Sequence, residues 1–446
     1  PGPVLLDIPL NVQHADIDPQ KLRGFTPPKE SKKRGALHAE IKKALALMSK
    51  AHRPAVLVGA GVKIAGAEKQ FLELVESLGY PVVCSWGAID IMPHNHPLLI
   101  GQIGVYGNRG ANFLIQNADL ILSIGSRLDT RQTSANAKSF GRAAKKIVVD
   151  IDTHQLHKNK IVADLPICAD IRNFIPALRK SLSAFPGPDI SDWLARAATW
   201  KNKYPACLPQ YIKQKKYVNP YVFNKTLSHE LAEGDITSLD IGSVMAWTMQ
   251  SFDVKKDQKL FSQFGHAPMG YGLPAAIGAA FATNKNRIIC ITGDGGLQMN
   301  IQELQTVIHY GLPIKIFVIN NNSYGMVRQF QDKYFDSNHV GTTPRQGYSA
   351  PNFVKIAAAY GLLTENITSH KGMAGKIRRV LNAKGPVLCN VAVKENEKIK
   401  PKLEARRLKN GRYLSLPIED QWPYLSRKEF NSNMIIPPID TIGGVK

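Results

Sequence analysis

Cysteine and long apolar runs are both scarce in this chain. The five cysteines, Cys84, Cys168, Cys207, Cys290 and Cys389, are scattered and form no CxxC pair, which argues against a disulfide framework or a cysteine-ligated metal. No apolar run approaches the ~20 residues that a membrane-spanning helix needs, and the opening residues show no basic and apolar leader. These absences indicate reduced thiols and a cytoplasmic protein without a membrane partner.

Acidic residues are also few. The chain has 35 Asp and Glu against 57 Lys and Arg, which gives a formal net charge of +22, and such an excess suggests nucleic-acid binding. The densest basic run, residues 394–412, is nevertheless interrupted by three glutamates. We therefore expect residues 396–446 to form a solvated basic tail and expect no nucleic-acid partner; a nucleic-acid-binding module is the last alternative. The positive charge can also attract small anionic substrates.

What the sequence does contain is a repeated alternation of buried strands and helices. A chain of 446 residues with 44% apolar content predicts two or three domains of the α/β class. Strands are expected at residues 55–58, 82–85, 120–124 and 147–151, and helices at 36–50, 67–78 and 170–182. We predict two doubly wound parallel-sheet domains: a Rossmann-like central domain over residues 36–185 and a second domain over residues 219–395, joined by a connector over residues 186–218.

The first turn of the central domain is rich in glycine. The sequence Gly59-Ala60-Gly61 follows the strand expected at residues 55–58, as in dinucleotide-binding folds. The full fingerprint fails, because Ile64 stands where the third glycine belongs. On this evidence a nucleotide-binding turn and an ordinary tight turn remain equally open.

The second domain places polar groups where two strands end. A strand at residues 288–291 leads into Gly293-Asp294-Gly295-Gly296, and a strand at residues 314–319 leads into Asn320-Asn321-Asn322, with a helix expected over residues 300–310 between them. Ligands bind at the carboxyl ends of parallel strands, carboxylate and amide oxygens suit Mg²⁺, and glycines with a helix N-terminus accommodate phosphate. The pattern predicts a magnesium and phosphate site. The alternative is an ordinary strand–helix–strand turn with capping Asp and Asn residues.

The spacing of these two motifs resembles the diphosphate-binding motif of thiamine-diphosphate enzymes. A glycine-rich segment, residues 268–278, lies one strand–helix unit earlier and agrees with it, as does a turn that follows a strand expected at residues 238–241. Across residues 36–393 the domain order and motifs resemble the acetolactate synthase group. The resemblance implies a decarboxylating carboligase of the pyruvate to 2-acetolactate type. It implies thiamine diphosphate and Mg²⁺ as cofactors and leaves open whether the central domain binds FAD.

The resemblance also implies which residues bind the metal. Asp294 would bind Mg²⁺ through its carboxylate, Asn321 through its amide oxygen and Ser323 through its backbone carbonyl. Asn321 is preferred to its neighbours because the family places a Gly-Met pair four and five residues later, and Gly325-Met326 fits only that register.

Met269 is implied as the apolar residue that supports the bent cofactor, and it is the one residue assigned to catalysis. It can also be a plain core residue. The residues implied to bind the cofactor are Ile241, Gly242, Ser243, Met269, Asp294, Gly295, Gly296, Asn321, Ser323, Tyr324, Gly325 and Met326.

The beginning of the chain resembles the end of another domain. Residues 1–13 are similar to the last strand of the pyrimidine-binding domain of this family, and residues 14–35 are expected to form a linker. The glutamate that activates the cofactor in the family belongs to that domain and has no counterpart here. We therefore expect these 446 residues to be a piece of a longer protein. General acid–base catalysis raises a reaction rate roughly 10²–10⁴-fold, so without this glutamate we expect the piece to be inactive alone.

Substrate choice stays open at this point. The family carries a Trp where this chain has Phe330, and it usually reads Phe-Asp-Asp-Arg where this chain has Leu128-Asp129-Thr130-Arg131. Residues 416–423 resemble those of family members associated with sugar modification. We expect pyruvate as donor and a homodimer or homotetramer. The alternatives are transfer of a pyruvate-derived acetyl unit to a keto sugar and a non-catalytic oligomerising relative.

Overall fold

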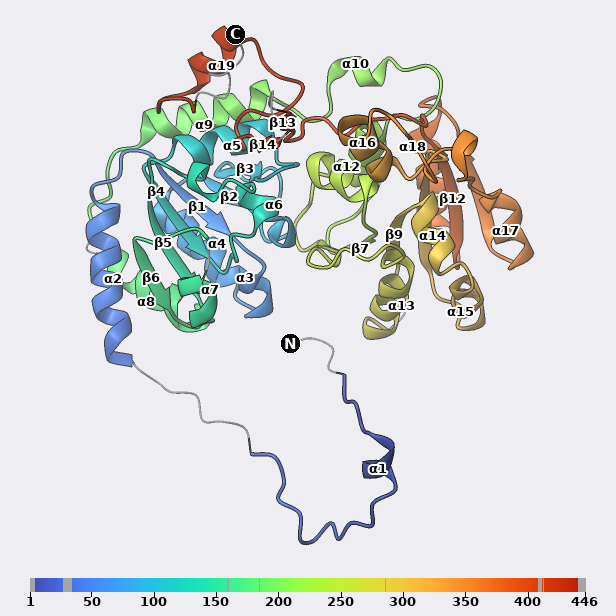
Figure 1. Cartoon of the computed structure of the whole chain (residues 1–446), viewed down its shortest axis with the longest axis horizontal. Coiled ribbons are helices and arrows are strands. Elements are labelled where there is room, and N and C mark those ends of the chain that lie inside the picture. The colour runs from blue at the N-terminus through green and yellow to red at the C-terminus, as the bar shows by residue number, and fades with distance from the viewer. Residues whose placement is uncertain are drawn as a thin grey trace.

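Two α/β domains lie side by side, and the N-terminal segment runs away from both (Figure 1). The structure is a computed structural model that describes residues 5–26, 34–158, 160–183, 185–284, 286–407, 411 and 413–439. Within these ranges, no helix combines the length and the apolar character needed to cross a membrane. The predicted fold class is confirmed, because each domain contains a six-stranded parallel sheet.

The central sheet has the strand order β3-β2-β1-β4-β5-β6. Its strands are β1 (Pro54–Val58), β2 (Val82–Cys84), β3 (Leu99–Gln102), β4 (Leu120–Ile124), β5 (Lys145–Asp150) and β6 (Leu165–Cys168). The four predicted strands are present within two residues of their expected bounds. β3 and β6 were not predicted, because each is short and contains a Gly or a Pro. The direction of winding reverses between β1 and β4, and such a switch point opens a crevice at the carboxyl edge.

Helices cover both faces of this sheet, and two further helices in the connector lead to the second domain (Figure 1). They are α2 (Arg34–Met48), α3 (Gly61–Ile64), α4 (Glu68–Leu78), α5 (Arg109–Asn117), α6 (Thr130–Thr133), α7 (Thr153–Lys158) and α8 (Ile171–Leu182), followed by α9 (Ser191–Lys203) and α10 (Pro209–Ile212) of the connector. Asp170 caps α8 by accepting a hydrogen bond from the backbone N–H of Arg172. Every residue of α5 is buried, because α9 packs on it and the C-terminal segment contacts it.

The second sheet has the order β11-β12-β10-β9-β7-β8. Its strands are β7 (Ile236–Leu239), β8 (Lys259–Phe261), β9 (Ile288–Gly293), β10 (Ile314–Asn320), β11 (Leu363–Ile367) and β12 (Val387–Ala392). Alternate residues of β9 enter two different cores, Ile289 on one face and Cys290 on the other. This two-sided burial explains the unbroken apolar runs of the sequence.

Helices flank the strands of the second domain, and those that follow β7, β9 and β10 begin close to the carboxyl ends of these strands. They are α11 (Pro220–Glu230), α12 (Ser243–Ser251), α13 (Gly272–Ala282), α14 (Asp294–Met299), α15 (Glu303–His309), α16 (Gly325–Tyr334), α17 (Phe353–Ala359) and α18 (Met373–Asn382). The segment after β9 differs from the prediction, because a helix begins at Asp294 itself instead of a loop. The strand expected at residues 238–241 ends earlier, at Leu239, so that Asp240 lies at its tip.

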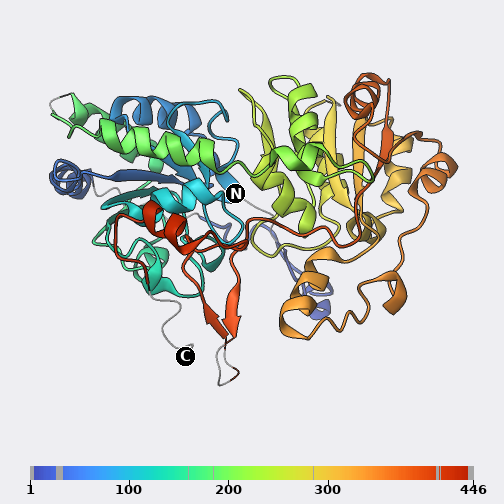
Figure 2. The same ribbon diagram turned by 90° about the horizontal axis from the view of Figure 1, so that it is seen from above.

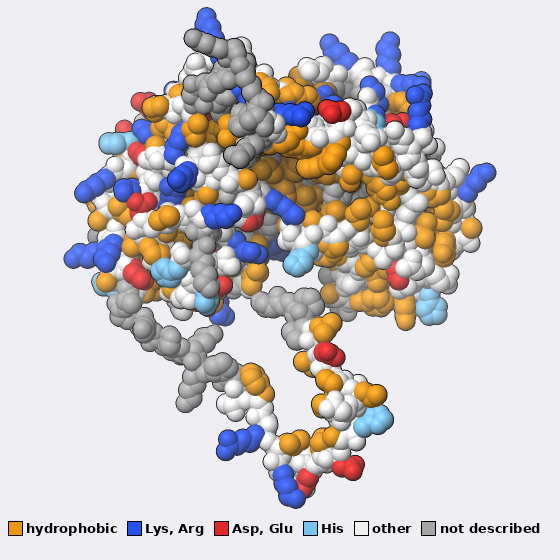
Figure 3. Space-filling model, viewed as in Figure 1, with side chains coloured by type: hydrophobic (Ala, Val, Ile, Leu, Met, Phe, Trp, Pro, Cys, Tyr) orange, Lys and Arg blue, Asp and Glu red, His pale blue; other side chains and the backbone are white. Residues whose placement is uncertain are grey.

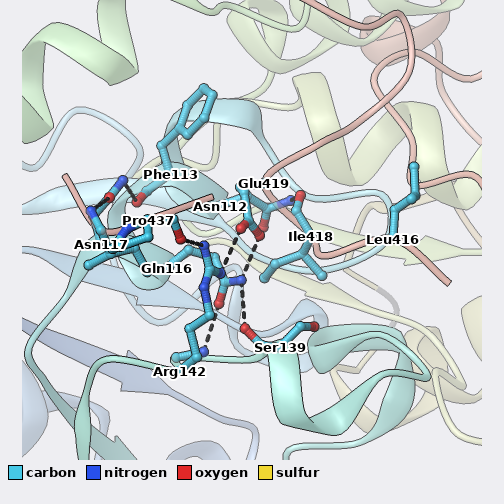
Figure 4. A network of polar contacts seen from close by, with 12 residues as sticks. Asn112, Phe113, Gln116, Asn117, Ser139, Arg142, Leu416, Ile418, Glu419 and Pro437 are labelled. Carbon is cyan, nitrogen blue, oxygen red and sulfur yellow. Dashed lines mark hydrogen bonds and ion pairs between the residues drawn. The ribbon is translucent and has the colours of Figure 1, made fainter. Parts of the chain in front are cut away.

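The prediction of a solvated basic tail is wrong for the described part of residues 396–446. After Ile399, which is fully buried, the chain crosses from the second domain to the central domain and forms β13 (Ala405–Arg407), β14 (Tyr413–Ser415) and α19 (Arg427–Asn433), as Figure 2 shows. Glu419 has no exposed surface and accepts a hydrogen bond from the Gln116 Nε2 atom at 2.6 Å (Figure 4). Ile418 is equally buried, and its carbonyl accepts a hydrogen bond from Asn112. Burial of apolar residues and of Glu419 therefore fixes this segment on the central domain, although its composition is basic.

The described residues 5–13 form no strand in the structure, and their origin in a pyrimidine-binding domain stays a prediction. Leu5 and Leu6 are 87% and 81% exposed, and Leu10–Gln13 form a short helix, α1. No described strand pairs with this segment, and an extended segment without a neighbour forms no strand ladder. Residues 1–4 of this segment, 27–33 of the expected linker and 440–446 of the tail lie outside the described residues.

Candidate functional site

A cavity of about 160 Å³ lies where β7, β9 and β10 end. The parallel register pairs Ile319 of β10 with Gly293 of β9, so that the residues after them are neighbours. Every residue implied above to bind the cofactor lines this cavity. The lining residues are Asp240, Ile241, Gly242, Ser243, Val244, Trp247, Met269, Gly293, Asp294, Gly295, Gly296, Ile319, Asn321, Ser323, Tyr324, Gly325, Met326 and Val327. The structure thus brings the predicted residues together, whereas their individual roles stay predictions.

Asp294 is the buried acid of this cavity. One carboxylate oxygen accepts a hydrogen bond from the backbone N–H of Gly295 at 2.9 Å, and the other accepts one from the backbone N–H of Ser323 at 3.2 Å. Burial raises the pKa of Asp294 to about 7, although these hydrogen bonds act in the opposite direction. A carboxylate that is costly to ionise in this environment would be stabilised by a cation beside it.

The loop after β10 is held in place by two segments that follow it. The Asn321 Nδ2 atom donates to the carbonyl of Glu395 at 3.2 Å, which leaves the amide oxygen as the atom of Asn321 able to coordinate a metal. The Ser323 hydroxyl donates to the carbonyl of Thr342 at 2.7 Å, so that coordination by Ser323 would fall to its backbone carbonyl. Asn322 has a φ of 50° and accepts a hydrogen bond from the Ala350 backbone.

The turn after β7 combines an unusual backbone with an unsatisfied hydroxyl. Gly242 has a φ of +85°, and no atom would lie within 4 Å of a Cβ placed there. The Ser243 hydroxyl is buried and has no hydrogen-bond partner among the described residues. A Cβ at Gly325 would lie 3.1 Å from the Ser243 Oγ atom and 3.0 Å from the Asn321 Nδ2 atom, which places both groups around one point. An unpaired donor at the start of α12 suits an anion.

Two glycines of the Asp294 motif are required by the protein itself. A Cβ at Gly295 would lie 2.3 Å from the ring of Tyr324, and a Cβ at Gly296 would lie 2.4 Å from the Asp240 Oδ2 atom. The sequence prediction attributed these glycines to the approach of phosphate. The structure adds a second reason, which is the close packing of α14 on its neighbours.

Met269 also lines the cavity and is 40% exposed. Its Cε atom would be 3.3 Å from a Cβ at Gly295, so that the thioether lies over the start of α14. This exposed position inside a cavity argues against a plain core role. Sequence reasoning missed Asp240, because the strand was expected to run through it. The missed signal was an acidic residue directly before the Ile241-Gly242 turn.

A second, larger cavity of about 570 Å³ opens at the carboxyl edge of the central sheet. Ala60 and Gly61 after β1 line it together with Gly125 and Ser126 after β4. A Cβ at Gly59 would lie 2.1 Å from the Gly125 carbonyl oxygen, because the two turns are in direct contact. The first glycine of this turn therefore serves packing, and the cavity lies at the switch point of the sheet.

Comparison with known protein families shows which family this chain belongs to. Residues 240–391 match the C-terminal TPP binding domain of the thiamine pyrophosphate enzymes, and residues 41–178 match the central domain of the same enzymes. The chain is 33% identical over 411 residues to a probable acetolactate synthase large subunit of Methanocaldococcus jannaschii, with 88% of this chain and 67% of that protein covered. This chain belongs to the acetolactate synthase-like thiamine pyrophosphate enzymes.

Other relatives of this family agree. The acetolactate synthase large subunit of Cyanidium caldarium is 34% identical, with 89% of this chain and 68% of that protein covered. The large subunit of acetolactate synthase isozyme 2 of Escherichia coli strain K12 is 30% identical, with 90% and 70% covered. As a thiamine pyrophosphate enzyme, this acetolactate synthase-like chain uses thiamine diphosphate as cofactor, and the cavity around Asp294 lies within the matched TPP binding domain.

Proposed function

We propose that this protein is a thiamine-diphosphate-dependent decarboxylating carboligase that takes pyruvate as donor and forms 2-acetolactate. The observation that carries the proposal is the arrangement of Asp294, Asn321 and Ser323 at the ends of β9 and β10 around one cavity. It is supported by similarity to acetolactate synthase large subunits along most of the chain.

Each side of the cavity has its own task in this proposal. The Asp294 carboxylate, the Asn321 amide oxygen and the Ser323 carbonyl hold Mg²⁺, an ion that prefers oxygen ligands. The backbone N–H group of Gly242 and the free Ser243 hydroxyl hold the diphosphate, a use that the unsatisfied hydroxyl supports. The backbone N–H of Gly295 already donates to Asp294, so Gly295 contributes close approach of the backbone and not a free donor. Gly296 adds a backbone N–H, and the matching positions Ile241, Tyr324, Gly325 and Met326 complete the walls.

Met269, whose Cε atom lies over Gly295, would contact the ring part of bound thiamine diphosphate and hold it in place. Bound thiamine diphosphate supplies the electron sink on which decarboxylation depends. The contribution of the chain is to hold that cofactor in one conformation and to limit access of water. The apolar side chains of Ile319, Met326 and Val327, which line the cavity, support the second task.

The larger cavity of the central domain is proposed to hold FAD. Its place at the switch point between β1 and β4 and its volume of about 570 Å³ support a dinucleotide. Visible absorption of the protein purified without added flavin, followed by release of the chromophore on denaturation, tests this part. A colourless preparation that also fails to bind added FAD would overturn it without affecting the thiamine site.

A keto sugar is the second candidate for the acceptor. Phe330, at the position where the family carries Trp, is 55% exposed and contacts Tyr334 with the two rings tilted by 41° and their centroids 4.3 Å apart. Its side chain is therefore available on the surface of α16. An acceptor screen with identification of the products separates the two candidates, and a product that contains the carbon skeleton of a sugar would favour this second one.

The surface of the second domain supports a homo-oligomer. Hydrophobic side chains gather over this domain on the face shown in Figure 3. Large exposed apolar residues of the domain include Phe281, Met299, Tyr310, Val327 and Phe330. Apolar surface of this extent usually meets another chain, and we propose a homodimer or homotetramer. A cytoplasmic location is part of the same proposal, since all five cysteines carry free thiols.

The decisive experiment has two stages. Titration calorimetry of this chain with thiamine diphosphate is expected to show binding that depends on Mg²⁺. The protein expressed from its natural gene is then expected to release carbon dioxide from pyruvate and to form 2-acetolactate. Cofactor binding without turnover would favour the non-catalytic relative, and rejection of pyruvate as donor would overturn the substrate assignment.

A further inference from the structure

Asp240 is a fully enclosed acid that has no task in the proposed mechanism. It follows the last residue of β7, is 1% exposed, and lines the cofactor cavity. Its Oδ1 atom accepts hydrogen bonds from the backbone N–H of Ile241 at 2.8 Å and from that of Gly270 at 3.1 Å. Its Oδ2 atom accepts one from the Thr292 hydroxyl at 2.7 Å. One side chain thereby joins three segments that surround the cavity.

The contact with Gly270 has the most specific consequence. The N–H of Gly270 is held by Asp240, and its carbonyl accepts a hydrogen bond from the Asn300 Nδ2 atom at 2.6 Å. Gly270 has a φ of +86°, and a Cβ there would lie 2.4 Å from the same Asn300 nitrogen. Hydrogen bonds to its N–H and to its carbonyl therefore hold Gly270 in a conformation that only glycine adopts without strain.

Met269 is the residue directly before Gly270. Its position over Gly295 therefore depends on the place of Gly270, and through it on Asp240 and Asn300. We propose that Asp240 is a positioning residue: its carboxyl group and the Asn300 amide clamp the Gly270 turn and thereby set Met269 against the thiazolium and pyrimidine part of the cofactor.

Carboxamide chemistry should serve the clamp as well as a carboxylate does. An amide oxygen can accept from both backbone N–H groups, and an amide nitrogen can donate to the Thr292 hydroxyl, which can turn to accept. The D240N variant therefore keeps the clamp, whereas D240A removes all three hydrogen bonds. Burial raises the pKa of Asp240, which agrees with a site where a neutral group of the same shape is tolerated.

The test compares two ligands, because the inference rests on the proposed function and must be separable from it. Thiamine diphosphate contains the ring part that Met269 would contact, whereas inorganic pyrophosphate contains only the part held by Mg²⁺ and the N–H groups. Both are titrated with Mg²⁺ into the full chain. We expect D240A and N300A to weaken thiamine diphosphate binding about tenfold, as loss of a buried hydrogen-bond clamp predicts, and to leave pyrophosphate binding within about twofold.

Two further variants complete the experiment. D240N is expected to bind both ligands as the unchanged chain does. M269A is expected to reproduce the loss for thiamine diphosphate, and the D240A/M269A pair to show no further loss, since residues that act through one another are not additive. If D240A folds poorly, N300A still removes one of the two hydrogen bonds that hold Gly270, and it is expected to fold because Asn300 is only partly buried.

D235N serves as the matched control, because Asp235 lies at the other end of β7, where it pairs with Arg287 at 2.6 Å. It should lower the unfolding midpoint without changing either affinity. Equal losses for thiamine diphosphate and pyrophosphate in D240A and N300A, or additive losses in the double variant, would overturn the inference. Failure of the unchanged chain to bind thiamine diphosphate at all would instead overturn the proposed function, and the inference with it.

Discussion

The Glu419 carboxylate lies 2.7 Å from the Arg142 guanidinium, although the two residues are 277 positions apart in the chain. Glu419 is completely buried, and Figure 4 shows it enclosed by Arg142 and Gln116. Arg142 also donates to the carbonyl of Pro437 at 2.9 Å. The segment from the second domain is thus fixed on the central domain by a charged pair that is shielded from water.

Replacing Glu419 by Gln is expected to lower the free energy of unfolding by about 3 kcal/mol, because an uncompensated Arg142 then remains largely buried. Chemical denaturation measures this loss. The matched control is E73Q, because the Glu73–Arg179 pair is short but exposed, with side chains 35% and 45% accessible. That change should cost less than about 0.5 kcal/mol. Similar losses in the two variants would show that burial of the Glu419 pair is energetically unimportant.

The sequence predicted the cofactor cavity better than it predicted the ends of the chain, and the reason lies in the range of the interactions. Asp294 and Asn321 are placed by their own strands, whose apolar runs are visible locally, and parallel pairing then makes them neighbours. Glu419 is placed by partners on α5 and at Arg142, far away in sequence. A local charge pattern contains no information about such partners, so the basic composition of the segment was misleading.

Asp240 was missed for a different reason. Sequence periodicity locates a strand but not its last residue, and a shift of two positions hid the fact that Asp240 stands at the tip of β7. The glycines at 295 and 296 were found, but the need for them was only partly understood. Their contacts with Tyr324 and Asp240 join segments that are distant in the sequence.

Binding of thiamine diphosphate with Mg²⁺ should depend on the protonation of Asp294. Burial raises the pKa of this carboxyl to about 7, and a metal ligand must be deprotonated. Affinity should therefore fall by up to about tenfold per pH unit below that value and level off above it. Calorimetry between mildly acidic and mildly alkaline pH measures the profile. D294N should bind weakly and without this pH dependence, and an equally steep profile in D294N would contradict the assignment.

The same carboxyl makes a prediction for the cofactor-free protein. Because the folded-state pKa of Asp294 lies above the ordinary value of 3.8, the folded protein holds the proton more tightly than the unfolded chain does. Its contribution to stability is present below pH 3.8 and is lost as the pH rises through about 7. The difference in unfolding free energy between the unchanged protein and D294N should shift in that direction over this range. Saturating Mg²⁺ and thiamine diphosphate should reverse the loss.

Lys315 in β10 should produce the opposite dependence on pH. Its side chain is buried and donates to the carbonyls of Ala383 and Gly385 at 2.6 Å each, and burial lowers its pKa to about 8. The folded protein therefore holds this proton less tightly than the unfolded chain does. Relative to K315M, the unchanged protein should gain stability as the pH rises from about 8 towards 10.5. Denaturation curves for both proteins at several alkaline pH values would reveal a constant difference if the prediction is wrong.

Two glycine-to-alanine changes should have opposite effects, although both glycines lie in helices. In G296A the new Cβ would lie 2.4 Å from the Asp240 Oδ2 atom, and the carboxylate that carries this atom is held by three hydrogen bonds, two to Oδ1 and one to Oδ2. We expect a loss of about 1–3 kcal/mol of stability, the usual cost of overpacking, together with weaker binding of thiamine diphosphate. In G278A, on the exposed side of α13, no atom lies within 4 Å of the new Cβ.

The G278A variant should therefore gain about 0.5–1 kcal/mol, because alanine favours a helix more than glycine does, and its cofactor affinity should not change. Denaturation and calorimetry on both variants measure these effects side by side. If G296A binds the cofactor as well as G278A does, the packing of α14 on Asp240 does not shape the cavity.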